Sequence, residues 1–319
     1  MRRIRSVLEE RDFRVLLTGQ FVAQAADGMA QAVFADRLIL EPVSAGTPER
    51  ILALFAITLV PYSGLAPFLG VFVDRWPRRA LMAWANALRA LILITLPMWA
   101  PRLPSDSGLF VGVIALLGLG RLFLTTKGAS LPTVLHERFL LRGNAISSGG
   151  GMISALFGGV VGLAAIGVIG GNEAFVLAGL AYALAAFALT RLSRSMAHPH
   201  PDPGPFAAEV AAIARELAQG LLEFARRARA RLPIIGVFIV RSVGMLTTIA
   251  AILVIKDLYE TDSTRRWISA VALGAAGAGA FIGASVAPLL GRKLPKAGLI
   301  ITGFCASGLG IVALGGIEN

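Results

Sequence analysis

The sequence has little of what soluble enzymes and metalloproteins use for chemistry. It holds one cysteine and three histidines among 319 residues, and 15% of its residues are charged, against about 25% in typical soluble domains. The single Cys305 excludes an intrachain disulfide and a metal site built on thiolates. The chain also lacks a recognisable set of nucleophile, base and orienting residue. The sequence therefore predicts no catalytic residues, no metal and no cofactor, and it argues against an enzyme.

Apolar residues, in contrast, make up 56% of the chain, which is more than a soluble globule of this size would bury. They gather in nine segments of about 20 residues, the length that a helix needs to cross a membrane. The segments lie at 14–36, 51–73, 80–100, 109–135, 145–169, 173–192, 233–255, 267–290 and 297–317. The sequence therefore predicts an all-α, polytopic bundle of transmembrane helices.

One long connection divides these segments into six and three. Residues 193–232 begin with a proline-rich run and continue with apolar residues at spacings of three and four, which is typical of an amphipathic helix. These apolar residues are Phe206, Val210, Ile213, Leu217, Leu221 and Phe224. We expect a six-span N-terminal half at 1–192, a cytoplasmic linker at 193–232 and a partial, three-span C-terminal half at 233–319. The linker helix would lie on the anionic cytoplasmic leaflet or, alternatively, be solvated.

The net charge of +11 reflects membrane topology better than nucleic-acid binding, because the basic residues are not interleaved with aromatic ones. Twenty Lys and Arg residues lie in the N-terminus and the even-numbered loops, against six in the odd-numbered loops. Cytoplasmic loops hold an excess of such residues. We predict a multi-pass protein of the cytoplasmic (inner) membrane with a cytoplasmic N-terminus and no nucleic-acid partner.

A short string between the second and third segments is the most informative motif. It reads Gly70-Val-Phe-Val-Asp-Arg-Trp-Pro-Arg-Arg79 and resembles the major facilitator superfamily signature, Gly-x-x-x-Asp-Arg-x-Gly-Arg-Arg, with Pro77 replacing the second glycine. A weaker copy, Gly291-Arg-Lys-Leu-Pro-Lys296, follows the eighth segment, as two homologous six-helix halves would leave. The run Phe13-Arg-Val-Leu-Leu-Thr-Gly-Gln20 and the triplet Leu88-Arg89-Ala90 are similar to the siderophore and macrolide exporter branch.

This resemblance implies a secondary active transporter that moves a small solute by alternating access, with proton-coupled efflux as the expected mode. Its partners would be membrane lipids, a small-molecule substrate and protons. Members of the superfamily have twelve spans, so the chain is expected to be a fragment or a product truncated after nine. Two alternatives stay open: a truncated membrane module with a binding or assembly role, and a lipid flippase of the same fold.

Ionisable and polar side chains inside the apolar segments are candidate functional positions, because burying them at membrane depth is costly. Asp27 shares one helical face with three glutamines at spacings of three and four. It would carry a proton in coupled transport or, alternatively, hold neighbouring helices together by hydrogen bonds. Arg121 resembles the family's fourth-span arginine, with a buried interhelical ion pair as the alternative. The candidate coupling or substrate-path residues are Gln20, Gln24, Asp27, Gln31, Arg89, Arg121 and Arg241.

The loop signature is predicted to form a latch within the first half. Asp74 and Arg78 are four residues apart and would pair across one turn if the loop were helical. Glu137, at the cytoplasmic end of the fourth segment, is the expected partner of Arg78. Three solvated loop charges are the alternative. The candidate gating residues are Gly70, Asp74, Arg75, Arg78, Arg79 and Glu137.

Overall fold

The computed structural model describes residues 8–40, 68–104, 106–193 and 205–226, together with scattered positions between 231 and 310. The four continuous ranges are almost entirely helical, and no strand occurs in them. The helices are α2 (Arg11–Ala35), η1 (Asp36–Leu40), α4 (Leu69–Arg75), α5 (Arg78–Trp99), η5 (Ala100–Arg102), α6 (Ser107–Val134), α7 (Glu137–Ile169), α8 (Gly171–Leu189) and α9 (Phe206–Arg226).

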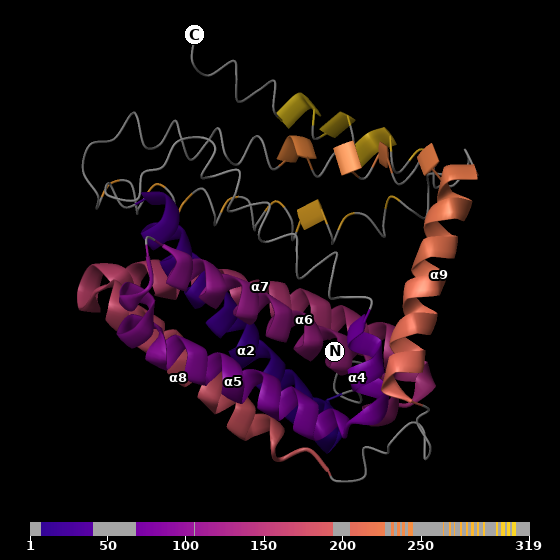
Figure 1. The fold of residues 1–319 in the computed structure, drawn as a ribbon, viewed down its shortest axis with the longest axis horizontal. Coiled ribbons are helices and arrows are strands. Elements are labelled where there is room, and N and C mark those ends of the chain that lie inside the picture. Colours follow the sequence, from indigo (N-terminus) through magenta and orange to yellow (C-terminus); the bar gives the residue numbers. More distant parts are fainter. Residues whose placement is uncertain are drawn as a thin grey trace.

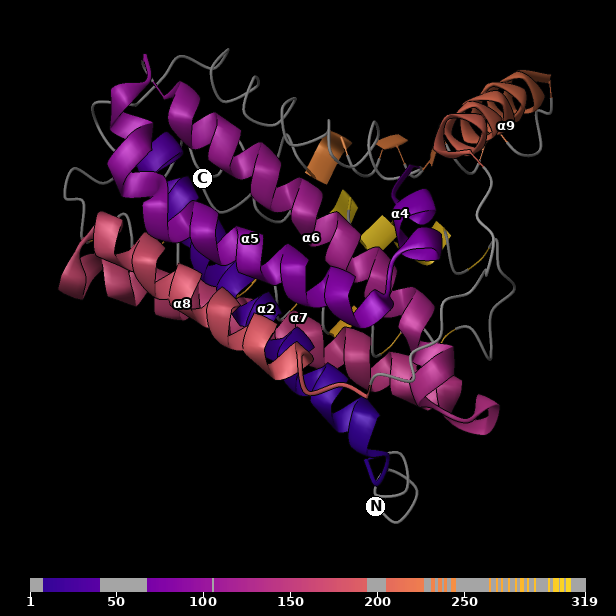
Figure 2. The ribbon, with the colours of Figure 1, turned by 60° about the horizontal axis from the view of Figure 1, so that its bottom comes forward.

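Five long helices form one bundle, in which α2 packs against α7 and α8, and α5 packs against α8 and α6 (Figure 1). Helix α9 stands outside this bundle, beside the short α4, and Figure 2 shows it apart from the other long helices. Contacts at both ends of α2 show that it runs antiparallel to α8. Asp12 Oδ1 accepts hydrogen bonds from Ser193 at one end, and Arg37 Nη2 donates to Asn172 Oδ1 at the other, 3.2 Å away.

Glycines bring α2 and α7 into backbone contact. A Cβ atom on Gly28 would lie 1.8 Å from the carbonyl oxygen of Ala155, and one on Gly158 would lie 1.9 Å from that of Ala25. Neither position therefore tolerates a side chain without moving a helix. Small residues that let backbones approach are the usual means of packing helices in membranes, where lipid removes the hydrophobic drive between them.

The helix bundle confirms the predicted all-α class. Helices α5, α6, α7 and α8 correspond to the third to sixth apolar segments, and each is long and apolar enough to cross a membrane. Among the described residues these four meet that criterion, whereas α2 is less apolar because Gln20, Gln24, Asp27 and Gln31 lie within it. The linker helix predicted after residue 205 is α9. The second segment is described only from residue 68, and the seventh to ninth segments lie outside the continuously described ranges.

The start of α7 differs from the prediction. The polar stretch between the fourth and fifth apolar segments was expected to be a loop, but α7 begins at Glu137 and runs for 33 residues. The connection between α6 and α7 is therefore only Leu135 and His136, both extended. The polar residues Arg138 and Arg142 extend the helix because Arg has a high helix propensity and no proline follows Pro132 in this region.

Candidate functional site

A buried ion pair lies in the middle of the bundle. Asp27 Oδ1, on α2, pairs with Arg89 Nη2 on α5 and accepts a hydrogen bond of 2.6 Å from the Tyr182 hydroxyl on α8. The side chain of Arg89 is 2% exposed and that of Asp27 is 21% exposed. A charge at this depth is tolerated only when it is paired and hydrogen-bonded. Asp27 thus joins three helices through one carboxylate oxygen.

Groups on α2, α5 and α8 contact the guanidinium of Arg89. Its Nη1 donates to Asn86 Oδ1 at 3.3 Å, and its Cζ lies 4.1 Å from the centre of the Tyr182 ring, in cation–π geometry. Helix α6 makes room for it at Gly120, where a Cβ atom would lie 3.0 Å from Arg89 Nη2. Its Nε is buried without a hydrogen-bond partner. The guanidinium is therefore paired with one carboxylate, and one of its N–H groups lacks a hydrogen-bond partner.

A second polar cluster joins α2, α6 and α7 nearer the start of α2. Gln20 Nε2 donates to Gln24 Oε1 and to the Ser147 carbonyl, both at 2.7 Å, and Ser147 Oγ donates back to Gln20 Oε1 at 2.7 Å. The ammonium group of Lys127 donates to Ser147 Oγ at 3.0 Å. Gln20, Ser147 and Lys127 are all buried. No carboxylate in the described part of the chain lies within 4.0 Å of Lys127, so its hydrogen-bond partner here is a neutral hydroxyl.

The structure brings together much, but not all, of the predicted polar face. Gln20, Gln24 and Asp27 face neighbouring helices, and Arg89 is the ion-pair partner of Asp27. Gln31, the fourth member of the predicted face, is exposed and makes no hydrogen bond with either cluster. Arg121 is half-buried on α6. Arg241 lies outside the described residues.

Sequence reasoning missed Tyr182 and Ser147 as members of the site. Tyr182 lies in the middle of an otherwise apolar segment, where a buried hydroxyl requires a hydrogen-bond partner. That requirement is the signal that would have identified it. Ser147 carried no such signal, because serine and glycine are common where helices pack closely in membranes.

The predicted latch at the loop signature is not formed. In the described ranges no ion pair within 4.0 Å joins Arg78 to Asp74 or Glu137, and both carboxylates are exposed. Instead, Arg78 Nη1 donates to the Ala129 carbonyl near the C-terminal end of α6, at 2.8 Å.

The reason lies in the two residues that separate α4 from α5. Trp76 is extended, with φ −113° and ψ 148°, and Pro77 is outside the helical region, with φ −55° and ψ 117°. Asp74 and Arg78 are therefore not on one helical turn, although their spacing would allow it. Pro77 ends α4 and precedes the first residue of α5, a position where proline fits. Gly70 has open space around its missing side chain, and Arg79 points into a groove described below.

Comparison with known proteins agrees with this architecture. The family model of the Major Facilitator Superfamily matches residues 16–317, and the chain belongs to that superfamily. An uncharacterized MFS-type transporter of Mycobacterium bovis and one of Mycobacterium tuberculosis are each 33% identical to it over 154 residues. The match covers 48% of this chain and 35% of each relative. The chain thus spans about a third of the length of the curated relatives it matches. It is a multi-pass membrane protein of a transporter family, and that family points away from an enzyme.

Proposed function

We propose that this chain forms all or part of a secondary active transporter, which exports a small solute across the cytoplasmic membrane by alternating access. Protons are the coupling ion, and the N-terminus is cytoplasmic. Membership of the superfamily supports the general activity, and the twenty to six distribution of basic residues supports the orientation. The domain plan of two halves, 1–192 and 233–319, joined by a linker at 193–232, belongs to the same proposal.

One observation carries the coupling part of this proposal: the only acid within the middle of the described bundle is shared by Arg89 and Tyr182 on two other helices. Protonation of Asp27 at its shared oxygen would remove the charge that holds Arg89. The guanidinium would then lose its anionic partner while staying buried, and contacts between α2, α5 and α8 would weaken together. A proton would in this way shift the balance between two arrangements of the bundle.

The polar residues around this pair form the proposed solute path. Gln24 and Gln20 lie about one and two turns before Asp27 on α2, and the neighbouring Lys127 adds a positive charge with a neutral partner. Arg121 and the exposed Gln31 belong to the same proposal. The loop residues Gly70, Asp74, Arg75, Arg78, Arg79 and Glu137 are proposed to act in gating, with Arg78 acting through Ala129 of α6 rather than through an ion pair.

The alternative, a purely structural role for Asp27, makes a different prediction for Asp27→Asn. A strain that overproduces the full chain would be screened for growth on a panel of toxic solutes, and solutes to which it gains resistance would be measured for efflux. We expect Asp27→Asn to abolish resistance while retaining most of the membrane-inserted protein. Asp12→Asn, the same change at the start of the same helix, is the matched control and should keep resistance. Full resistance with unchanged pH dependence in Asp27→Asn would overturn the coupling role.

A further inference from the structure

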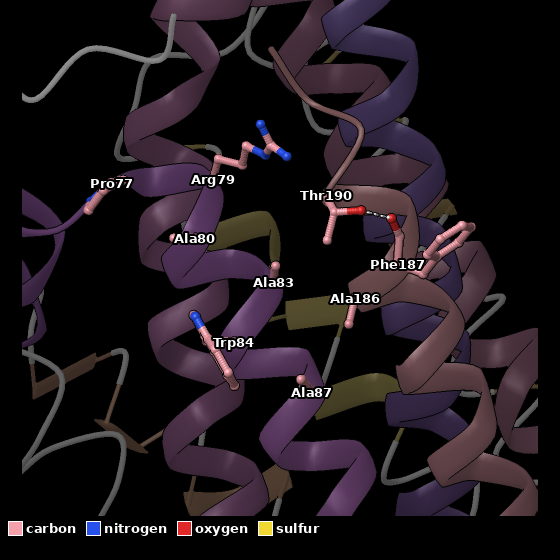
Figure 3. A pocket seen from close by; sticks show the side chains of 9 residues that line it. All are labelled: Pro77, Arg79, Ala80, Ala83, Trp84, Ala87, Ala186, Phe187 and Thr190. Carbon is pink, nitrogen blue, oxygen red and sulfur yellow. Dashed lines mark hydrogen bonds between the residues drawn. The ribbon is translucent and has the colours of Figure 1, made fainter. Parts of the chain in front are cut away.

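The outer side of α5 and α8 carries a groove that the proposed transport path does not use. Its volume is about 550 Å³, in the range of small-molecule sites, and nine residues of the two helices, of the connection before α5 and of the turn after α8 line it. Figure 3 shows Arg79 and Thr190 at one end, with Ala83, Trp84 and Ala87 following along α5, and Ala186 and Phe187 on α8 across from them, with the Phe187 ring directed away from α5.

Helices α5 and α8 are in close contact at one level, and at another level only small side chains lie between them. Gly179 of α8 meets α5 directly, since a Cβ atom there would lie 2.7 Å from Ile94 Cγ1 and 3.1 Å from the Ala90 carbonyl oxygen. About two turns towards the start of α5, Ala83 and Ala87 face α8. Alanine side chains do not fill the space that opens there.

The walls of the groove belong to an outward-facing, apolar surface of the bundle. Trp84 is 63% exposed and Phe187 is 56% exposed, and both are flanked on their helices by further exposed leucines. Because α5 and α8 are long and apolar enough to cross a membrane, this exposed surface would face lipid. The groove is thus open to the bilayer, on the opposite side of α5 from the buried Arg89.

One end of the groove is positively charged. Arg79 is half-buried, is the only charged residue among the nine that line the groove, and has no hydrogen-bond or ion-pair partner in the described part of the chain. On the α8 side, the Arg191 guanidinium lies 4.7 Å from the centre of the Phe187 ring. Thr190, at the same end, is neutral, and its hydroxyl donates to the Phe187 carbonyl at 2.6 Å. An unpaired guanidinium at the end of an apolar groove fits a phosphate, which it can bind in bidentate geometry.

The position of this end matches the depth of a lipid headgroup. Arg79 is the second residue of α5, and Thr190 follows the last residue of α8, so both lie where these helices leave the membrane. The stretch from Arg79 to Ala87 rises about 12 Å along the helix axis, compared with about 15 Å for one hydrocarbon leaflet. The same end of the bundle holds the contact between Asp12 and Ser193, which the proposed topology places on the cytoplasmic side.

We propose that this groove binds one anionic phospholipid of the cytoplasmic leaflet. Its phosphate contacts Arg79, with Arg191 nearby, and one acyl chain lies along Ala83 and Ala87 between Trp84 and Phe187. A zwitterionic lipid would present an ammonium group to the same two guanidinium groups and would therefore bind more weakly. The site lies on lipid-facing helices, and its test does not depend on the identity of the transported solute.

Trp84 provides the probe, since it forms one wall of the groove. The full chain with Trp84 as its sole tryptophan (Trp76→Phe, Trp99→Phe and Trp267→Phe) would be reconstituted in vesicles of phosphatidylcholine and phosphatidylglycerol. In each of two series, one of these lipids carries brominated acyl chains, which quench tryptophan fluorescence. The two quenching curves give the relative binding constant of the two lipids at Trp84. We expect phosphatidylglycerol to be preferred about fivefold, the contribution of roughly one basic side chain at an anionic lipid surface.

Three variants of the sole-tryptophan protein test the assignment. Arg79→Gln should reduce the preference to about one, whereas Arg79→Lys should retain most of it. Arg102→Gln, at the opposite end of the α5 segment, is the matched control and should leave the preference unchanged. Equal quenching by both lipids in the unsubstituted protein would mean ordinary bilayer contact, and quenching by neither would mean that protein covers the groove. Either result, or an equal effect of the Gln and Lys substitutions at Arg79, would overturn the proposal.

Discussion

The pairing of Asp27 with Arg89 leads to a quantitative prediction about stability. Replacing Asp27 by Asn leaves the Arg89 guanidinium, which is 2% exposed, without an anion. Breaking a buried pair in this way typically costs about 3–5 kcal/mol. Replacing Arg89 by Met leaves a carboxylate that is more exposed and still accepts a hydrogen bond from Tyr182. We therefore expect Arg89→Met to cost less, about 1–3 kcal/mol.

The double variant Asp27→Asn/Arg89→Met removes both charges and keeps the approximate volume. We expect its cost to be smaller than the sum of the single costs by at least about 1.5 kcal/mol, because neither partner is left as an uncompensated charge. Unfolding of the purified full chain in micelles, followed by circular dichroism during titration with a denaturing detergent, gives the three values relative to the unsubstituted protein. Costs that add to within about 0.5 kcal/mol would refute an energetic coupling between the two residues.

Three further predictions concern packing, the second polar cluster and topology. Gly158→Ala should destabilise the bundle by about 1–3 kcal/mol, because its Cβ would lie 1.9 Å from the Ala25 carbonyl oxygen, whereas Gly167→Ala meets no atom within 4 Å and should leave the melting temperature unchanged or raised. Ser147→Ala should cost about 1–3 kcal/mol by depriving Lys127 of its hydrogen-bond partner, and adding Lys127→Met should recover part of this loss in the same melting assay. Reporter fusions should indicate a cytoplasmic location at Arg79, Arg142 and Arg226 and an external location at Thr47 and Asn172, and the reverse pattern would contradict the proposed orientation.

The sequence predicted the class of fold well, because hydropathy depends on composition over a whole segment. Apolar runs marked α5, α6 and α8 to within three residues at each end, since their boundaries coincide with charged or loop residues. The start of α7 was placed eight residues too late, because the polar first turns of a transmembrane helix project out of the apolar run. Hydropathy indicates which residues lie in lipid, whereas the end of a helix is set by its backbone hydrogen bonds.

The candidate site was predictable in part. Helical spacing identified Gln20, Gln24 and Asp27 as one face, but spacing does not say where that face meets another helix, and Gln31 falls beyond the contact. The partners Tyr182 and Ser147 are distant in sequence, so only the packing of α2 against α8 and α7 defines them. Local periodicity contains no information of that kind.

The loop signature shows how a local rule fails when the backbone is not regular. Pairing of residues four apart holds within a helix, and Trp76 and Pro77 interrupt the helix between Asp74 and Arg78. The same proline that replaces the family's second glycine thus determines where Arg78 points. Its guanidinium reaches the end of α6 instead, at the Ala129 carbonyl.

The most direct test of the central claim compares two transport modes in proteoliposomes that contain the full chain or its Asp27→Asn variant, with a solute found in the resistance screen. An imposed pH gradient should drive accumulation of the solute by the unsubstituted protein and not by Asp27→Asn. Exchange of labelled for unlabelled solute, which needs alternating access but no net proton movement, should persist in both. Equal gradient-driven accumulation in the two proteins would contradict coupling through Asp27, and the absence of both modes in correctly inserted, unsubstituted protein would contradict transport by this chain.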